Sequence, residues 1–201
     1  MKTLKLFIAK NKAAFVAAAV IFFAGSLYGA ICSCNMSADA ADALKKHISV
    51  FLEPGTAAST DPWKIFSADA LNHIKYILAA LICASGTYLI PVFCFVLATK
   101  GYQLGFSAGF ISAYFGTSGT VLALSSTLFS YVFSVPLYFF IFVLLIRFLS
   151  KRKRNPASIS GRERTREYFA YILSLFIVFS LLCLTSGAGA FLTPLIAEFL
   201  N

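Results

Sequence analysis

The chain has 201 residues, of which 59% are hydrophobic and 12% are charged, and its formal net charge is +9. Its mean hydropathy is +0.82. This composition excludes a soluble globular domain, because uncharged stretches exceed the roughly 20 residues that cross a bilayer core of about 30 Å. We therefore predict an all-α fold: a polytopic membrane bundle of about five transmembrane helices that forms a single domain over residues 1–201.

The first two predicted spans cover residues 13–33 and 76–99. The first follows the lysine-rich start "MKTLKLFIAKNK" and resembles a signal peptide. Its uncharged run is longer than the apolar region of a usual signal peptide, so we predict an uncleaved membrane anchor. The second span ends at Lys100. It contains Gly86 and Pro91, and we expect a break at Pro91 where neighbouring helices satisfy the freed backbone groups.

The uncharged stretch 101–146 is more than twice as long as one bilayer-spanning helix at about 1.5 Å per residue. A turn is predicted at "FGTSGT", where glycines and hydroxyl residues gather. This turn separates a third span at 101–115 from a fourth at 121–149, and Pro136 is expected to break the fourth. The fifth predicted span covers residues 168–185.

Three glycines, Gly101, Gly105 and Gly109, recur at every fourth position of the third predicted span. Residues four apart lie on one face of a helix. In a membrane, small residues on one face let two helix backbones approach closely. The spacing therefore predicts a helix-packing seam.

Basic residues gather before the first span and in the loop 151–167, "KRKRNPASISGRERTRE". Because basic loops stay preferentially in the cytoplasm, we predict a cytoplasmic N-terminus, an extracytoplasmic C-terminus and an extracytoplasmic loop at 35–70. This bias accounts for the sequence pI of 9.4 without a nucleic-acid partner. The basic loop also attracts anionic membrane lipid.

The loop 35–70 contains an amphipathic helical pattern in which Ile48 and Phe51 fall near one apolar face. A second helix start follows, with Trp63 suited to the membrane interface. Two interpretations remain open at this point. The helix either lies on the outer leaflet or offers a docking surface for an extracytoplasmic partner through Ile48, Phe51 and Trp63.

The sequence shows no set of catalytic residues, no cofactor-binding motif and no metal-ligand spacing. The histidines, His47 and His73, fall outside the predicted spans, and no acidic residue falls at mid-membrane depth in them. Such buried acidic residues are typical of proton relays and transporters. We therefore predict that the protein is not an enzyme and needs no cofactor.

The order of features along the chain resembles the stage II sporulation protein M family. The segment "LNHIKYILAALICASGTYLIPVFCFVLATKGYQLGFSAGF" is similar to members of that family in its Asn-Lys start, its internal glycine and proline and its Lys-Gly step. The serine-rich "SSTLFSYVFSVPLYFF", the basic loop and the terminal "LTPLIAEFL" continue the resemblance over nearly the whole chain.

The resemblance implies a five-span membrane protein that anchors a peptidoglycan-degrading complex during forespore engulfment. Its implied partners are stage II sporulation proteins D and P, which cleave peptidoglycan, and its implied location is the septal membrane of the sporulating cell. A small permease or channel-like transporter component is the alternative. That alternative would use the breaks at Pro91 and Pro136 to form a binding site.

Overall fold

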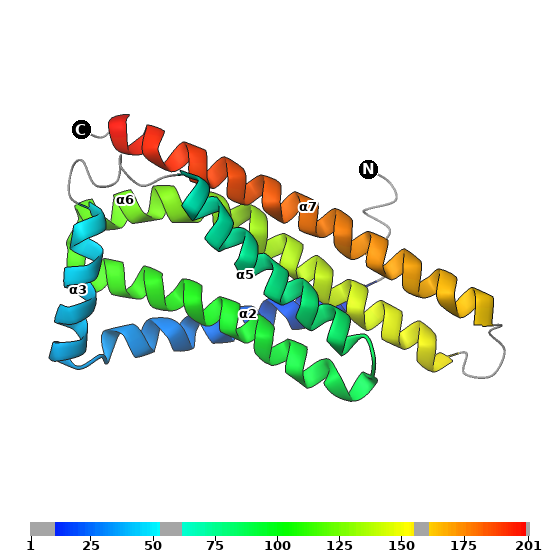
Figure 1. Cartoon of the computed structure of the whole chain (residues 1–201). Helices are drawn as coiled ribbons and strands as arrows, with labels where there is room; N and C mark the ends of the chain where they lie inside the picture. Colours follow the sequence, from blue (N-terminus) through cyan, green and yellow to red (C-terminus); the bar gives the residue numbers. More distant parts are fainter. Residues whose placement is uncertain (1–10, 53–61, 155–160, 200–201) are drawn as a thin grey trace.

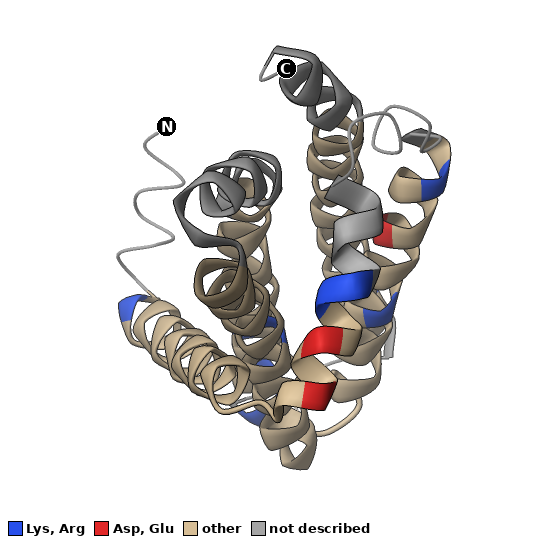
Figure 2. Cartoon of the chain, turned by 90° about the vertical axis from the view of Figure 1, so that its left-hand side faces the viewer, with Lys and Arg blue, Asp and Glu red and all other residues tan. Residues whose placement is uncertain are grey.

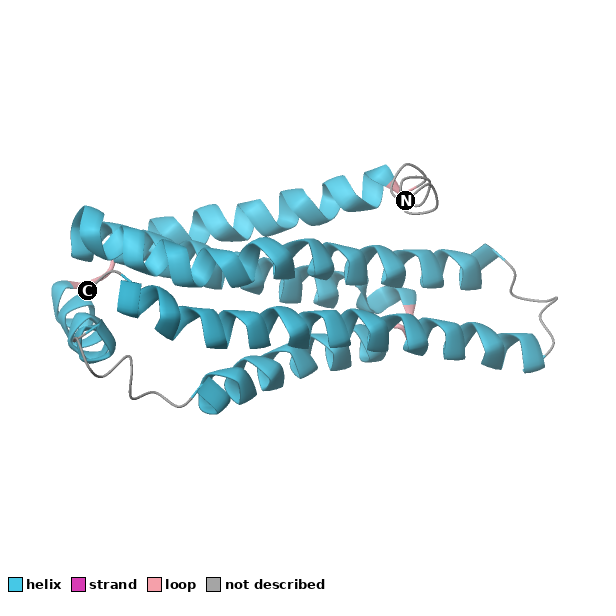
Figure 3. Ribbon diagram, turned by 90° about the horizontal axis from the view of Figure 1, so that it is seen from above, coloured by secondary structure: helices cyan, strands magenta, loops and turns pink. Residues whose placement is uncertain are grey.

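A computed structural model describes residues 11–52, 62–154 and 161–199. Within these residues every regular element is a helix, and the helices run alongside one another in a bundle (Figure 3). In chain order the elements are α2 (Lys12–Cys34), α3 (Ala38–Leu52), α5 (Pro62–Cys83), the short 3-10 helix η1 (Thr87–Leu89), α6 (Ile90–Arg154) and α7 (Gly161–Phe199).

Five helical segments are long and apolar enough to cross a membrane, so the predicted all-α, five-span fold class is confirmed. Of the described helices, α3 is the one without such a segment, and it lies across one end of the bundle (Figure 1). We call this end the α3 end. The five segments are Lys12–Cys34, Trp63–Cys83, Thr87–Tyr114, Phe133–Lys153 and Thr165–Ala190.

The predicted boundaries of the second and third spans are wrong. The chain leaves helix α5 after Cys83 and turns at Gly86, so the expected span 76–99 joins the end of one helix to the start of the next. Helix α5 instead begins at Pro62, inside the expected loop 35–70. The sequence prediction failed because it used Lys100 as a boundary, whereas this lysine lies inside the segment Thr87–Tyr114.

Helix α6 doubles back on itself, since the rings of Phe93 and Phe142 stack with centroids 6.1 Å apart. Its backbone nevertheless stays helical from Ile90 to Arg154. Neither the residues of the expected turn, 115–120, nor Pro136 interrupts the helix. Pro91 also breaks no span, because it is the second residue of α6. Proline is tolerated in the first turn of a helix, where its missing N–H would have no helical partner.

The turn between α5 and α6 lies at the end of the bundle opposite α3, which we call the basic end. Here Arg152 donates hydrogen bonds to the carbonyl oxygens of Ala84 (3.3 Å) and Ser85 (2.9 Å) and to the hydroxyl of Tyr168 (2.8 Å). Carbonyl groups past the end of a helix lack helical partners, and in a membrane they need protein donors. Arg152, in the expected cytoplasmic loop 151–167, therefore also ties α6 to the end of α5.

The three glycines of the predicted seam face α2. A Cβ atom on Gly101 would overlap the carbonyl oxygen of Phe22, and one on Gly105 would overlap that of Ser26. One on Gly109 would overlap the Ser33 hydroxyl. The residue numbers of the contacting pairs increase together along both helices. Helix α2 and the first half of α6 therefore run parallel, with their backbones in contact.

Helix α2 contributes two glycines of its own to this contact. A Cβ atom on Gly25 would overlap the carbonyl oxygen of Ala98, and one on Gly29 would overlap that of Tyr102. The two glycines stand four residues apart in "GSLYG", the spacing of a close-packing membrane motif. The sequence analysis missed this motif, although the same rule that identified Gly101, Gly105 and Gly109 predicts it.

The orientation of the bundle is a prediction from charge. Figure 2 looks onto the α3 end, with acidic and basic residues on α3 in the foreground. The side chains of Lys45 on α3 and Lys153 near the basic end are both exposed. In a cysteine-free background, we expect a cysteine at Lys45 to react with a membrane-impermeant thiol reagent in intact cells and one at Lys153 to remain unlabelled. The reverse pattern would overturn the predicted orientation.

Candidate functional site

Four polar side chains from three helices form a continuous hydrogen-bonded chain inside the bundle, which we call the buried chain. The Ser186 hydroxyl on α7 donates to Asp69 Oδ2 on α5 at 2.5 Å. His73 Nε2 lies 2.6 Å from Ser186 Oγ, and His73 Nδ1 lies 2.6 Å from the Tyr138 hydroxyl on α6. The chain therefore links α5, α6 and α7 at one level.

The directions of these hydrogen bonds follow from the carboxylate. Because Ser186 gives its hydrogen to Asp69, its oxygen is left to accept from His73 Nε2–H. Neutral histidine then accepts at Nδ1 from the Tyr138 hydroxyl. Ser186 and His73 are thus each both donor and acceptor, and Tyr138 is a donor, so no buried polar group of the chain is left without a partner.

Lys100 lies beside the buried chain, near the middle of its span. Its ammonium nitrogen is 4.8 Å from the ring centroid of Tyr76 and 5.4 Å from that of Tyr138, and the residue is only 3% exposed. A cation is attracted to the face of an aromatic ring, more strongly where water is excluded. The carboxylate of Asp69 supplies the opposite charge within the same bundle.

Exposure differs along the chain. His73 is 2% exposed and Ser186 3%, whereas the Asp69 side chain is 37% exposed. Asp69 lies about 10 Å along α5 from its start at Pro62, at roughly 1.5 Å per residue. Between the buried chain and the basic end the core is apolar or aromatic, made by Phe93, Leu97, Ile141, Phe142, Leu145, Phe148, Tyr171, Leu175 and Val178.

Serine, histidine and aspartate are the residue types of a hydrolase triad, but their order here differs. In a triad, serine gives its hydrogen to histidine and the carboxylate orients the other ring nitrogen. Here Ser186 donates to Asp69, and His73 faces a tyrosine on its other side. Among the described residues, no three histidine, cysteine or acidic side chains gather as metal ligands. The geometry is that of a proton-sharing or helix-linking chain.

The sequence prediction placed His73 and Asp69 outside the spans, and that prediction is wrong. Both lie in the segment Trp63–Cys83, so an acidic residue does occur within a span. One signal was available: Asp69 and His73 are four residues apart and share one helical face. Ser186 and Tyr138 lie far away in sequence, so no local spacing connects them to that pair.

The predicted docking residues lie at the α3 end. Trp63 is 66% exposed, on the first turn of α5, and meets Phe66 edge-on with ring centroids 5.9 Å apart. Ile48 and Phe51 belong to helix α3, but their side chains are outside the described part of the structure. Ahead of them Ala41 is 1% exposed, so the apolar face of α3 is covered in its first turn.

Comparison with known proteins gives one family. The family model described as stage II sporulation protein M matches residues 18–194. No curated protein and no solved structure matches the chain. The match covers the described helices from α2 to most of α7. The chain therefore belongs to the stage II sporulation protein M family and is a sporulation-related, multi-pass membrane protein.

Proposed function

We propose that this protein is a non-enzymatic membrane scaffold that anchors a peptidoglycan-degrading complex during forespore engulfment. The partners are stage II sporulation proteins D and P, and the site of action is the septal membrane. Family membership supports a role in sporulation. The observation that carries the scaffold role is α3, a helix that crosses one end of the bundle (Figure 1).

Helix α3 has the properties of a docking element. Its 15 residues include Asp39 in the first turn, and its exposed side chains include Asp42, Lys45 and Lys46. The preceding loop is short, because α2 ends at Cys34, so the position of α3 is fixed close to the membrane surface. A partner bound there would be held beside the membrane, which is what a scaffold for hydrolases requires.

Ile48→Asp with Phe51→Asp is expected to disperse a fluorescently tagged hydrolase partner and block engulfment in a sporulating host. Two charges in the later turns of α3, beyond the buried Ala41, oppose burial of that part of the helix against a partner, because an unpaired buried charge is costly. Partner position is measured by fluorescence microscopy, and membrane insertion of the variant is measured by immunoblotting.

The matched control is Ala43→Asp with Ser49→Asp, which adds the same charges at positions about 80° to 160° around α3 from Ile48 and Phe51, at 100° per residue. This control should keep the partner at the septum. If the first variant fails to insert, Ile48→Ser with Phe51→Ser repeats the test with a smaller change. A hydrolase that still gathers at the septum with a fully inserted α3 variant would contradict docking through α3.

A small permease or channel-like component is the second candidate function, and the buried chain favours it. Ionisable residues within spans often mark paths for ions or protons. This protein does carry ionisable residues within its spans, namely Asp69, His73 and Lys100. Their presence favours a transport function. The apolar core between the buried chain and the basic end closes any such path at that side, so the scaffold is the function we place first.

A further inference from the structure

The ring of His73 has hydrogen-bond partners for a second hydrogen as well as for the first. In the neutral form Nε2 carries the hydrogen and donates to Ser186 Oγ, while Nδ1 accepts from the Tyr138 hydroxyl. Both contacts are 2.6 Å long. A hydroxyl oxygen can also accept, so a hydrogen added at Nδ1 has an acceptor in Tyr138 across the same contact. The ring can therefore take up a proton and keep both neighbours.

A carboxylate lies close to this ring and supplies the opposite charge. The Oδ2 atom of Asp69 is 3.6 Å from His73 Nε2, and the two residues stand four apart on α5. An opposite charge within about 4–6 Å favours the charged form of an ionisable group. The Asp69 side chain is 37% exposed and that of His73 is 2% exposed. Asp69 therefore compensates a charged ring and links it to the outside of the bundle.

The other ionisable groups around this pair come from all three helices. They are Tyr76 on α5, Lys100, Tyr131 and Tyr138 on α6, and Cys183 on α7. Tyrosine and cysteine are mostly uncharged below about pH 8. Lys100 is the cation of this set, with its ammonium nitrogen 5.4 Å from the ring centroid of Tyr138. It opposes a second positive charge nearby, so a charged His73 depends on the carboxylate of Asp69.

We propose that His73 is a proton-sensitive switch that reverses the hydrogen bond between α5 and α6. At high pH the Tyr138 hydroxyl donates to Nδ1. After the ring takes one proton from water, Nδ1–H donates to Tyr138. Tyr138 is only 2% exposed, so its own hydrogen then needs a new acceptor, and the packing of α6 against α5 changes. The switch does not rest on the proposed scaffold role, and the engulfment assays do not test it.

The test observes the ring of His73 directly, by nitrogen NMR of the purified protein in detergent with isotope-labelled histidine. The chain has two histidines, so His47→Gln leaves one histidine signal. The chemical shift distinguishes a ring nitrogen that carries hydrogen from one that does not. Between about pH 8 and pH 5, Nδ1 should gain a hydrogen while Nε2 keeps its own. An Nδ1 without hydrogen throughout this range, or with hydrogen throughout, would overturn the proposal.

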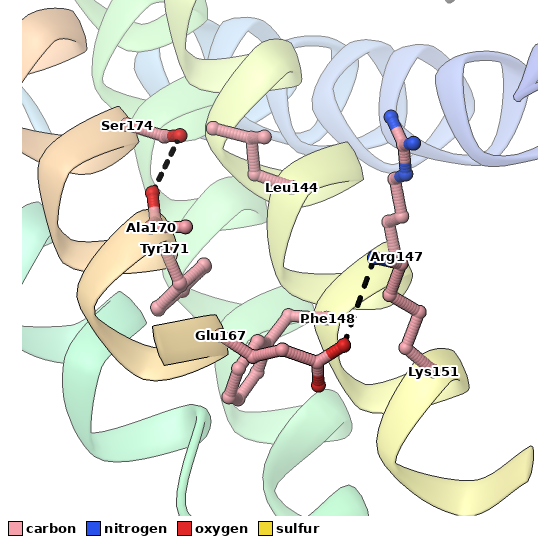
Figure 4. Close-up of a pocket in the computed structure, with 8 residues that line it drawn as sticks. All are labelled: Leu144, Arg147, Phe148, Lys151, Glu167, Ala170, Tyr171 and Ser174. Carbon is pink, nitrogen blue, oxygen red and sulfur yellow. Dashed lines mark hydrogen bonds and ion pairs between the residues drawn. The ribbon is translucent and has the colours of Figure 1, made fainter. Parts of the chain in front are cut away.

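Three variants test whether the switch depends on Asp69. Asp69→Asn removes the carboxylate but keeps an acceptor for Ser186, and it should abolish the change at Nδ1. Asp69→Glu restores a carboxylate and should restore the change. Glu167→Gln is the matched control, because Glu167 is also 37% exposed and faces Lys151 at the basic end (Figure 4). It should leave the change intact. A change that persists in Asp69→Asn, or that Glu167→Gln also removes, would contradict this switch.

Discussion

Replacing Gly105 by leucine is expected to remove most of the folded protein from the membrane. A Cβ atom at Gly105 already overlaps the backbone of Ser26, so the neighbouring atoms are not a flexible side chain that can rotate away. Overpacking a well-packed site costs about 1–3 kcal/mol and more where backbone must move. Since α2 packs along this face of α6, the two helices would have to separate. Folded protein is measured as the monodisperse fraction after detergent extraction.

Ala108→Leu is the matched control, because Ala108 is exposed on the same helix three residues further along. It introduces the same side chain and should leave the folded fraction unchanged. Gly105→Ala should fall between the two, since one methyl group demands a smaller shift. If leucine at positions 105 and 108 gave equal yields, the contact between α2 and α6 would not determine folding.

The glycine pattern illustrates what the sequence determines here. A repeat of four residues places Gly101, Gly105 and Gly109 on one helical face, and close packing in lipid follows from the absence of side chains. The partner helix does not follow from the repeat. The "GSLYG" motif carries the same spacing and predicts α2 as a close-packing helix, but only the structure pairs the two motifs.

The number of spans could be predicted from hydropathy, whereas the boundaries of the second and third spans could not. A lysine within an apolar sequence is expected at a membrane surface, and Lys100 was placed there on this rule. It is buried instead, with its ammonium group against the rings of Tyr76 and Tyr138, whose faces attract a cation. Those groups come from distant segments, so the exception is visible only in three dimensions.

The buried chain was only partly accessible from the sequence for the same reason. The spacing of Asp69 and His73 predicts a shared helical face, but it does not say what that face contacts. Ser186 and Tyr138 complete the chain from positions 117 and 65 residues away from their partners in sequence. Serine and tyrosine are common in membrane helices, so neither stands out before the helices are packed.

Replacing Asp69 by leucine is expected to destabilise the bundle by about 2 kcal/mol. The substitution leaves the Ser186 hydroxyl without its acceptor, inside the hydrogen-bonded chain that joins α5, α6 and α7. A buried polar group that loses its hydrogen-bond partner costs about 1–3 kcal/mol, and Ser186 is only 3% exposed. Domain stabilities are about 5–15 kcal/mol, so this is a large fraction of the total. The measurement is thermal unfolding in detergent.

Asp69→Asn at the same position separates the two candidate functions. Asparagine has the same shape, and its carbonyl oxygen still accepts from Ser186, so most of the folded protein should remain. It has no carboxylate to exchange a proton or hold a cation. A scaffold should therefore keep its hydrolase partner at the septum and support engulfment with Asp69→Asn, while Asp69→Leu loses both through misfolding. An Asp69→Asn protein that inserts, unfolds at the wild-type temperature and yet fails in engulfment would contradict the passive scaffold. That result would assign the function to the charge at Asp69, as a permease or channel-like component requires.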